Sequence, residues 1–295
     1  MNSLENLTQE VTQLAVKQTR YSLGQQINEG GTGAVFLAQD TELGRDVAIK
    51  RLKHNSNDTA TLFPDTLRRE ARVLASLNHP NIVTIHDVYR DEGEICVVME
   101  LLNGETMNEV AQRSSLDLED LAELVQQSQD ALLAAHENDI VHGDLKPENI
   151  MRIHSGNGRP QYKLLDFEQA RLTDLSQRTD QILLSTYGSP HFMAPERFEG
   201  TPPTRAADIY AMGCVYYHAL TGTLPFQGST PVEVMYSHLN HIVTPLCELR
   251  PDLPAWVGQW IDWQLTRNPS DRPRSSLAVS ESFRELKQQF NTEAA

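Results

Sequence analysis

The chain has 295 residues, 39% hydrophobic and 22% charged, a globular balance whose length suits two lobes. Its formal net charge of −15 excludes nucleic acid and anionic lipid as expected partners, while a basic protein segment would be attracted. Its 3 cysteines form no CxxC pair, the first ten residues lack an apolar core, and no apolar run reaches membrane-spanning length. We therefore expect a cytoplasmic chain without a secretory signal or a membrane segment.

The first half of the chain is rich in strand patterns. Residues 1–20 form a polar extension with apolar positions at helical spacing. Residues 21–52 predict strands around a glycine-rich turn, and a helical pattern runs from Pro64 to Leu77. Two further strands are predicted, at Ile82–Ile85 and Ile95–Met99.

The second half changes character after Asn103-Gly104 and becomes helical. Apolar periodicity predicts helices over residues 118–138, 206–220, 232–239, 255–265 and 277–290. We therefore expect an α+β, bilobal fold: a small antiparallel β-sheet N-lobe with one main helix, and a larger, mostly helical C-lobe. The lobes are predicted at 21–102 and 103–290, with a short tail at 291–295.

A glycine-rich turn and a buried-strand lysine are the first chemical signals. Gly30, Gly31 and Gly33 lie between two strand patterns, where backbone N–H groups could approach a phosphate. Taken alone, such glycines more often mark a plain hairpin turn. Lys50 ends the apolar Val47-Ala48-Ile49 and needs an anionic partner if buried, for which Glu70 and a phosphate are the candidates.

The strongest signal is the polar run at residues 142–149, His-Gly-Asp-Leu-Lys-Pro-Glu-Asn. It places Asp144, Lys146 and Asn149 close together after an apolar pair. A hairpin turn at residues 155–160 then returns a second carboxylate, Asp166, on a paired strand. Carboxylate and amide oxygens grouped in this way suit Mg²⁺ bound together with phosphates.

These motifs, in this order, resemble those of eukaryotic-type (Hanks-type) serine/threonine protein kinase catalytic domains, including bacterial ones. The resemblance runs from Tyr21 to Leu286. It includes residues 188–196, similar to the end of an activation segment, and residues 208–213, similar to the start of the central buried helix. Arg272-Pro273 resembles the arginine that pairs with the glutamate of Ala-Pro-Glu, here Glu196.

The resemblance implies the protein kinase fold, ATP as phosphoryl donor, Mg²⁺ or Mn²⁺ as metal, and transfer to serine or threonine of a protein substrate. It implies that Asp144 is the catalytic base and that Lys146 neutralises the γ-phosphate. Asn149 and Asp166 would hold the metal, and Ser189 and Glu148 would position the substrate. The implied ATP-binding residues are Ile27, Gly30, Gly31, Gly33, Val35, Ala48, Lys50, Glu70, Met99, Glu100, Leu102 and Met151.

Three positions depart from the family pattern. Asn28 replaces the first loop glycine, Gly143 replaces the arginine before the catalytic aspartate, and Glu168 replaces the glycine of Asp-Phe-Gly. The last two resemble loops of aminoglycoside and choline kinases, so a small-molecule phosphotransferase is one alternative. A pseudokinase scaffold that binds nucleotide or partners without turnover is the other. We expect a protein substrate with basic residues near the target hydroxyl, and Glu148 and Glu105 to favour an arginine N-terminal to that hydroxyl.

Overall fold

A computed structural model describes residues 20–30, 33–52, 77–91, 94–154, 158–167, 171–172 and 190–293. These residues fall into two compact units. The first contains the described part of residues 20–52 together with Ile85–Leu101, and the second contains residues 77–84 and the chain from Leu102 onward. Residues 1–19 of the predicted extension and residues 64–76 of the predicted helix lie outside the described residues.

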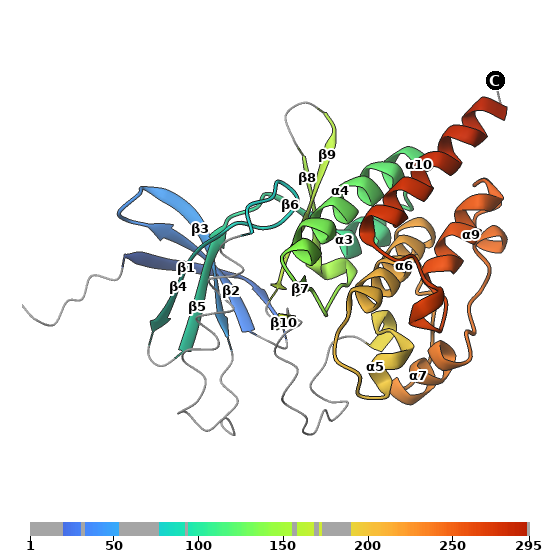
Figure 1. The fold of residues 1–295 in the computed structure, drawn as a ribbon. Coiled ribbons are helices and arrows are strands. Elements are labelled where there is room, and N and C mark those ends of the chain that lie inside the picture. Colours follow the sequence, from blue (N-terminus) through green and yellow to red (C-terminus); the bar gives the residue numbers. More distant parts are fainter. Residues whose placement is uncertain are drawn as a thin grey trace, which may run out of the picture. The chain divides into compact units, whose positions relative to one another are not determined.

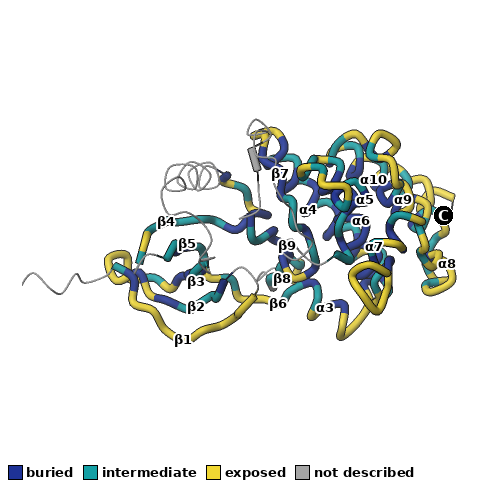
Figure 2. Tube along the Cα trace, turned by 90° about the horizontal axis from the view of Figure 1, so that it is seen from below, coloured by how far each residue is buried: buried dark blue, intermediate teal, exposed yellow. Residues whose placement is uncertain are grey.

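The first unit is an antiparallel sheet in the order β1-β2-β3-β5-β4 (Figure 1). Its strands are β1 (Tyr21–Glu29), β2 (Gly33–Asp40), β3 (Arg45–Leu52), β4 (Ile85–Asp91) and β5 (Glu94–Glu100). Successive side chains of a strand point to opposite faces, so each strand contributes to two different surfaces. β1 is an edge strand and is exposed along most of its length, as Figure 2 shows.

One face of this sheet carries the core of the unit. Its buried residues are Tyr21, Ala38, Val47, Ile49, Cys96 and Val98. An ion pair lies at the start of β1, where the guanidinium of Arg20 donates to both carboxylate oxygens of Asp40, at 3.0 and 2.8 Å. Asp40 is fully buried and also accepts from the Leu43 amide, so it ties the turn after β2 to the start of β1.

The strand predicted at Ile82–Ile85 is wrong, because β4 begins only at Ile85. Ile82 instead makes an isolated parallel bridge to Leu164 in the second unit, and both residues are buried in that unit's core. The backbone of Leu164 accepts from Val83 and donates to Asn81. Ile82 is therefore apolar because it is buried in the core of the second unit, and not because it lies in the sheet of the first.

The second unit combines helices with a three-stranded sheet, in the order β6-β8-β9, and a two-stranded one, β10-β7 (Figure 1). The strands are β6 (Gly104–Thr106), β7 (Ile140–Val141), β8 (Ile150–His154), β9 (Pro160–Leu164) and β10 (Arg171–Leu172). The α-helices are α3 (Met107–Arg113), α4 (Leu118–Glu137), α5 (Pro195–Phe198), α6 (Arg205–Thr221), α7 (Pro231–Leu239), α8 (Leu246–Leu249), α9 (Ala255–Gln264) and α10 (Ser276–Glu293). The 3₁₀ turns are η1 (Pro147–Asn149), η3 (Pro190–Phe192) and η4 (Pro269–Asp271).

The five long helices predicted from periodicity are confirmed as α4, α6, α7, α9 and α10. Side-chain caps begin several of them, since Asp117, Thr204 and Thr230 each accept a backbone N–H of the first helical turn. α3 was not predicted, because its seven residues are too few for a periodic pattern. Its capping box, Thr106 with Glu109, is the signal that could have found it.

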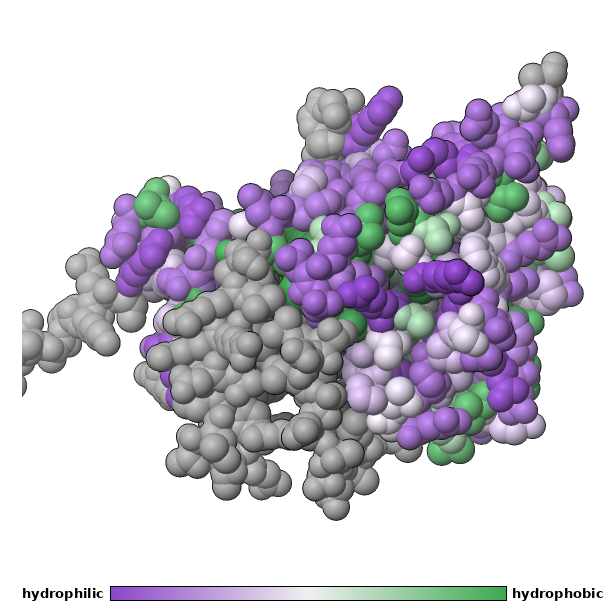
Figure 3. Space-filling view, viewed as in Figure 1, coloured by the Kyte–Doolittle hydropathy of each residue, from purple (hydrophilic) through white to green (hydrophobic). Residues whose placement is uncertain are grey.

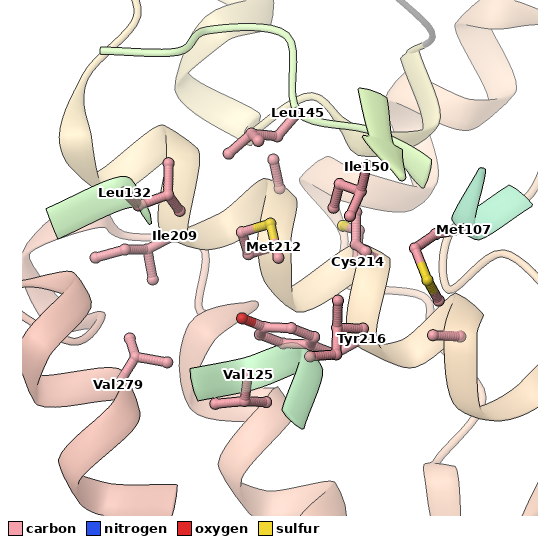
Figure 4. Packing of buried hydrophobic residues seen from close by; sticks show 14 of the residues in the cluster. Met107, Val125, Leu132, Leu145, Ile150, Ile209, Met212, Cys214, Tyr216 and Val279 are labelled. Carbon is pink, nitrogen blue, oxygen red and sulfur yellow. The ribbon is translucent and has the colours of Figure 1, made fainter. Parts of the chain in front are cut away.

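Helix α6 is the centre of the second unit. It is buried on all sides from Ala207 to Leu220, as expected for a helix enclosed by others. Figure 4 shows Ile209, Met212, Cys214 and Tyr216 of α6 among side chains from several other elements. A loop attached to this helix is therefore anchored to the buried interior of the unit.

No helix among the described residues is both long enough and apolar enough to cross a membrane. On the face drawn in Figure 3, hydrophilic residues predominate and hydrophobic ones form small, separate patches.

Candidate active site

The loop that follows β7 is held to the start of α6 by its backbone. Asp208, in the first turn of α6, accepts the amides of His142 and Gly143, each at 2.9 Å. The same carboxylate contacts Nε2 of His136 on α4, also at 2.9 Å. Asp208 is buried, and these three partners satisfy a charge that would otherwise be costly to bury.

Gly143 adopts a backbone conformation that suits glycine. Its φ is 78°, in the region that residues with a Cβ atom rarely adopt. Sequence comparison with the family pattern shows only that an arginine is missing here. The structure adds that glycine lets the chain make this turn without strain, with its amide held by Asp208.

Asp144, Lys146 and Asn149 form a polar cluster beyond this turn. The Lys146 ammonium lies 2.7 Å from Oδ2 of Asp144. The Asn149 side-chain amide donates to the Asp144 backbone carbonyl at 2.8 Å and to its Oδ2 at 3.3 Å. The Asp144 side chain is 10% exposed and that of Lys146 is 23% exposed, so the cluster keeps partial access to solvent.

The predicted hairpin is confirmed, because β8 and β9 pair antiparallel and return the chain to this cluster. The Leu165 amide donates to the Asn149 carbonyl at 2.8 Å, which sets the backbone of Asp166 next to that of Asn149. His142 contacts the Leu165 carbonyl through Nε2 at 2.8 Å, and its ring lies 4.5 Å from that of Phe167. Asp166 itself has a left-handed φ of 61°.

The donors available for a metal are the amide oxygen of Asn149 and the carboxylate of Asp166. Among the described residues, no group of three or more His, Cys, Asp or Glu side chains could hold a metal ion. Two oxygen donors are too few to enclose a cation, but they fit Mg²⁺, which usually takes its other ligands from phosphates and water.

In the first unit, four of the predicted nucleotide-binding residues share one face of the sheet. Val35 lies opposite Lys50, and Ala48 lies opposite Met99. Cross-strand partners in an antiparallel sheet share a face, and so do residues two apart on one strand. This face is opposite the one that carries Val47, Ile49 and the rest of the unit's core. Lys50 is 7% exposed.

The glycine-rich turn is partly explained by packing alone. The Gly30 amide donates to the Gly33 carbonyl at 2.9 Å and closes the turn. A Cβ atom on Gly33 would lie 2.1 Å from the Arg51 carbonyl oxygen, so the β2–β3 pairing itself demands glycine. A Cβ atom on Gly30 would meet no atom within 4 Å. Among the described glycines of this turn, Gly30 is therefore the one whose presence packing does not explain.

The remaining predicted residues are dispersed or not described. Ile27 is 46% exposed on the edge strand β1. Glu100 pairs with Val47 in the first unit, while Leu102 and Met151 belong to the second. Gly31, Glu70 and Ser189 lie outside the described residues, as does Glu168.

Of the two acidic residues suggested for substrate recognition, only Glu148 is exposed next to the polar cluster. Glu105 is held by Arg113, whose guanidinium donates to Oε1 at 2.9 Å and also contacts Oε2. A substrate cation would have to displace that arginine, so Glu148 is the better candidate.

The expected pairing of Arg272 with Glu196 is confirmed. The guanidinium donates to both carboxylate oxygens, at 2.8 and 2.7 Å, and lies over the Tyr210 ring at 4.7 Å. It also donates to three backbone carbonyls, those of Thr266, Ala206 and Arg267. This buried arginine therefore connects α5, α6 and η4.

Two residues that support the loop, Asp208 and His136, were not predicted from the sequence. The signal for Asp208 was a carboxylate in the first turn of an otherwise apolar helix, which needs buried partners. Which partners it finds depends on the packing of α4 and α6 against β7, and no local pattern reports that.

Comparison with known proteins agrees with this geometry. Residues 21–284 match the family described as "Protein kinase domain". The chain is 37% identical over 262 residues to serine/threonine-protein kinase PknA of Mycobacterium tuberculosis, covering 87% of this chain and 58% of that one. It is 36% identical over 255 residues to serine/threonine-protein kinase PrkC of Bacillus subtilis, covering 86% and 38%.

A third relative is serine/threonine-protein kinase pkn2 of Myxococcus xanthus, 33% identical over 268 residues, with 90% of this chain and 32% of the relative covered. The chain thus spans less than two thirds of the length of these relatives.

Proposed function

This chain belongs to the protein kinase domain family, and we propose that it transfers the γ-phosphate of ATP to serine or threonine hydroxyls of a protein substrate. The observation that carries the proposal is the cluster of Asp144, Lys146 and Asn149, whose loop is fixed to the central helix through Asp208. Relatives named as serine/threonine-protein kinases support the substrate class.

Asp144 is the proposed catalytic base. Its carboxylate orients the substrate hydroxyl and accepts its proton as the oxygen attacks phosphorus. Lys146, 2.7 Å from Asp144, carries the positive charge that stabilises the transferred phosphoryl group. Asp208 is a positioning residue, since it holds the amide of Gly143 next to Asp144 and touches no reacting atom.

The face of the first sheet with Val35, Ala48, Lys50 and Met99 is the proposed nucleotide surface. Its apolar side chains cover the adenine, and Lys50 binds the α- and β-phosphates. Gly30 is where the backbone approaches the phosphates, because no contact with the described residues requires a glycine at this position. The predicted roles of Ile27, Gly31, Gly33, Glu70, Glu100, Leu102 and Met151 remain part of this proposal.

Asn149 and Asp166 are the proposed metal ligands. A bound Mg²⁺ would neutralise the charge that develops on the phosphates during transfer. Two oxygen donors favour a metal that arrives with the nucleotide, and Mn²⁺ has similar ligand preferences. We propose Mg²⁺ as the working ion.

The proposed partner is a protein with a basic segment, which the net charge of −15 and the exposed Glu148 favour. Ser189 is proposed to assist substrate positioning. The free cysteines and the requirement for ATP support a cytoplasmic location for the catalytic reaction.

The test is turnover of ATP with a generic basic protein, compared between the wild type and Asp144→Asn. We expect transfer by the wild type, near loss of transfer by the variant, and almost unchanged ATP binding in both, followed as a thermal shift with Mg²⁺. ATP binding without turnover by the wild type would instead identify a pseudokinase. Turnover of an aminoglycoside or choline, but not of protein, would identify a small-molecule phosphotransferase.

A further inference from the structure

An open cavity of about 440 Å³ lies where the start of α4, the segment between α8 and α9, and the end of α10 meet. Its volume is in the range of cavities that bind ligands in proteins. None of the described residues that line it belongs to the cluster of Asp144, Lys146 and Asn149 or to the predicted nucleotide-binding residues. The proposed function therefore does not account for this cavity.

Apolar side chains line part of the cavity. Leu118 and Leu253 are partly buried and pack on the core of the second unit. Phe290, near the end of α10, is 38% exposed. One turn earlier, Lys287 donates to Glu119 of α4 at 2.7 Å and so holds this end of α10 on α4. A ligand that covers Leu118, Leu253 and Phe290 would gain by removing their apolar surface from water.

Charged side chains line the rest of the cavity. Arg250 donates to both carboxylate oxygens of Asp252, each at 2.8 Å, and to the backbone carbonyls of Leu116 and Leu220. These bonds use most of the guanidinium donors. The Asp252 side chain is nevertheless 61% exposed, and Asp117 is exposed at the N-cap of α4. Two carboxylates and one guanidinium give the lining a net negative charge, which favours a cationic ligand.

We propose that the cavity is a docking site for a segment of the protein substrate in which a large apolar side chain lies next to a lysine or arginine. This inference rests on the proposed function and adds a second contact between the kinase and its substrate. The apolar side chain covers Phe290 and Leu253, and the neighbouring cation meets the carboxylates of Asp117 and Asp252. An acidic or phosphorylated segment would be repelled by the same carboxylates.

The docking site and the catalytic loop are attached to opposite ends of α4. Leu118 begins the helix, whereas His136, in its last turn, contacts Asp208, which holds the amide of Gly143. At 1.5 Å per residue, Leu118 and His136 are about 27 Å apart along the helix. A docked segment therefore does not touch the reacting atoms. It raises the local concentration of the substrate hydroxyl, so it should lower KM and leave kcat unchanged.

The test uses serine peptides with one acceptor sequence, joined by a Gly/Ser linker to the docking segment Arg-Leu-Lys-Leu. A linker of 20 residues has ends about 25 Å apart on average. With it, we expect KM to be about tenfold lower than for the same peptide with alanine in place of both leucines. Glutamine in place of both cations should also raise KM. A linker of four residues reaches at most about 14 Å and should remove the advantage of the leucine segment.

Variants of the cavity locate the effect. Phe290→Ser should abolish the advantage of the leucine segment and leave kcat and KM for the unlinked serine peptide unchanged. Leu277→Ser, at an exposed apolar residue at the other end of α10, is the matched control and should keep the advantage. Asp252→Asn should reduce the advantage by less, because Asp117 remains. Equal KM values for the leucine and alanine peptides, or an advantage that persists in Phe290→Ser, would overturn the inference.

Direct binding separates this inference from the proposed function. In fluorescence anisotropy, the labelled docking segment should bind the wild type at least tenfold more tightly than it binds Phe290→Ser. This binding without phosphotransfer to any peptide would refute the proposed function and still support the site. Phosphotransfer to unlinked peptides without this binding would overturn the docking site alone. Self-association that Phe290→Ser abolishes, without peptide binding, would assign the surface to a second copy of the chain and also overturn it.

Discussion

Lys50 shows how much one buried charge implies. It is 7% exposed and lies in a strand whose other buried residues are apolar. A buried ammonium is costly unless an anion accompanies it. The register of the sheet places Lys50 on the face of Val35, Ala48 and Met99, away from the core of the unit. Lys50 therefore does not belong to the core of the unit, which agrees with its proposed role at the nucleotide.

Replacing Lys50 with methionine keeps the apolar stem and removes the charge. We expect kcat to fall by on the order of 10²-fold or more, because a phosphate contact made in the transition state is lost. The measurement is the initial rate of protein phosphorylation at saturating ATP. Arg51→Met, the adjacent cation on the opposite face, is the control and should keep its rate per folded molecule. Equal rates for wild type and Lys50→Met would refute the assignment.

At the scale of elements, two ion pairs hold strands and helices in place. Arg20 and Asp40 connect the start of β1 to the end of β2. The hydrogen bonds from Arg20 lower the pKa of Asp40 to about 2, and burial opposes them. The ion pair between Arg20 and Asp40 therefore stabilises the folded state by an amount that depends on pH.

We expect Asp40→Asn to lower the urea midpoint of unfolding, and to do so by an amount that shrinks in acid. The folded pKa of about 2 lies below the unfolded value of about 3.9. The stabilisation is thus fully present above pH 4 and is lost as pH falls toward 2. Midpoints of both proteins from pH 2 to 6 check this. The exposed Asp46→Asn should show no such convergence with the wild type, and a difference independent of pH would contradict the prediction.

The second pair, Arg272 with Glu196, joins three elements of the second unit. Arg272→Met leaves a mostly buried carboxylate without its partner, and we expect a loss of about 3–5 kcal/mol in the free energy of unfolding. Denaturant titration of the variant measures it. Adding Glu196→Met should recover part of the loss, because the unpaired charge is then removed. A loss below 1 kcal/mol would show that the pair does not hold these elements together.

At the scale of the whole molecule, Gly143 bears on regulation. In the family pattern an arginine at this position binds a phosphate on the activation segment. Glycine offers no such donor, and the loop here is instead held by Asp208 through backbone amides. The geometry of the catalytic loop therefore does not depend on a phosphate contact at residue 143.

We expect the protein to be active without phosphorylation of Thr173, Ser176, Thr179, Ser185 or Thr186. After phosphatase treatment and its removal, the time course on an added substrate should be linear from the start. A variant with alanine at all five positions should keep most of this rate. A lag that ends with autophosphorylation, together with an inactive alanine variant, would refute the prediction. Ser189 stays intact in that variant because of its proposed role at the substrate.

Features that depend on local pattern could be predicted from the sequence. Apolar periodicity located α4, α6, α7, α9 and α10 to within a few residues, because a helix that packs on one face must repeat with its own turn. Turn residues located the β8–β9 hairpin, and the polar run at 142–149 identified the cluster of Asp144, Lys146 and Asn149.

Contacts between groups far apart in the sequence could be found only in the folded structure. Ile82 was predicted to lie in a strand. In the structure it is buried in the core of the second unit and makes an isolated bridge to Leu164. In the sequence, Gly143 is noticeable only because the family pattern has an arginine there. In the structure, its φ of 78° allows the turn, and its amide donates a hydrogen bond to Asp208, 65 residues away. The periodicity of apolar residues predicts that a side chain is buried. The role of that side chain depends on the residue that contacts it, and this residue comes from a distant part of the chain.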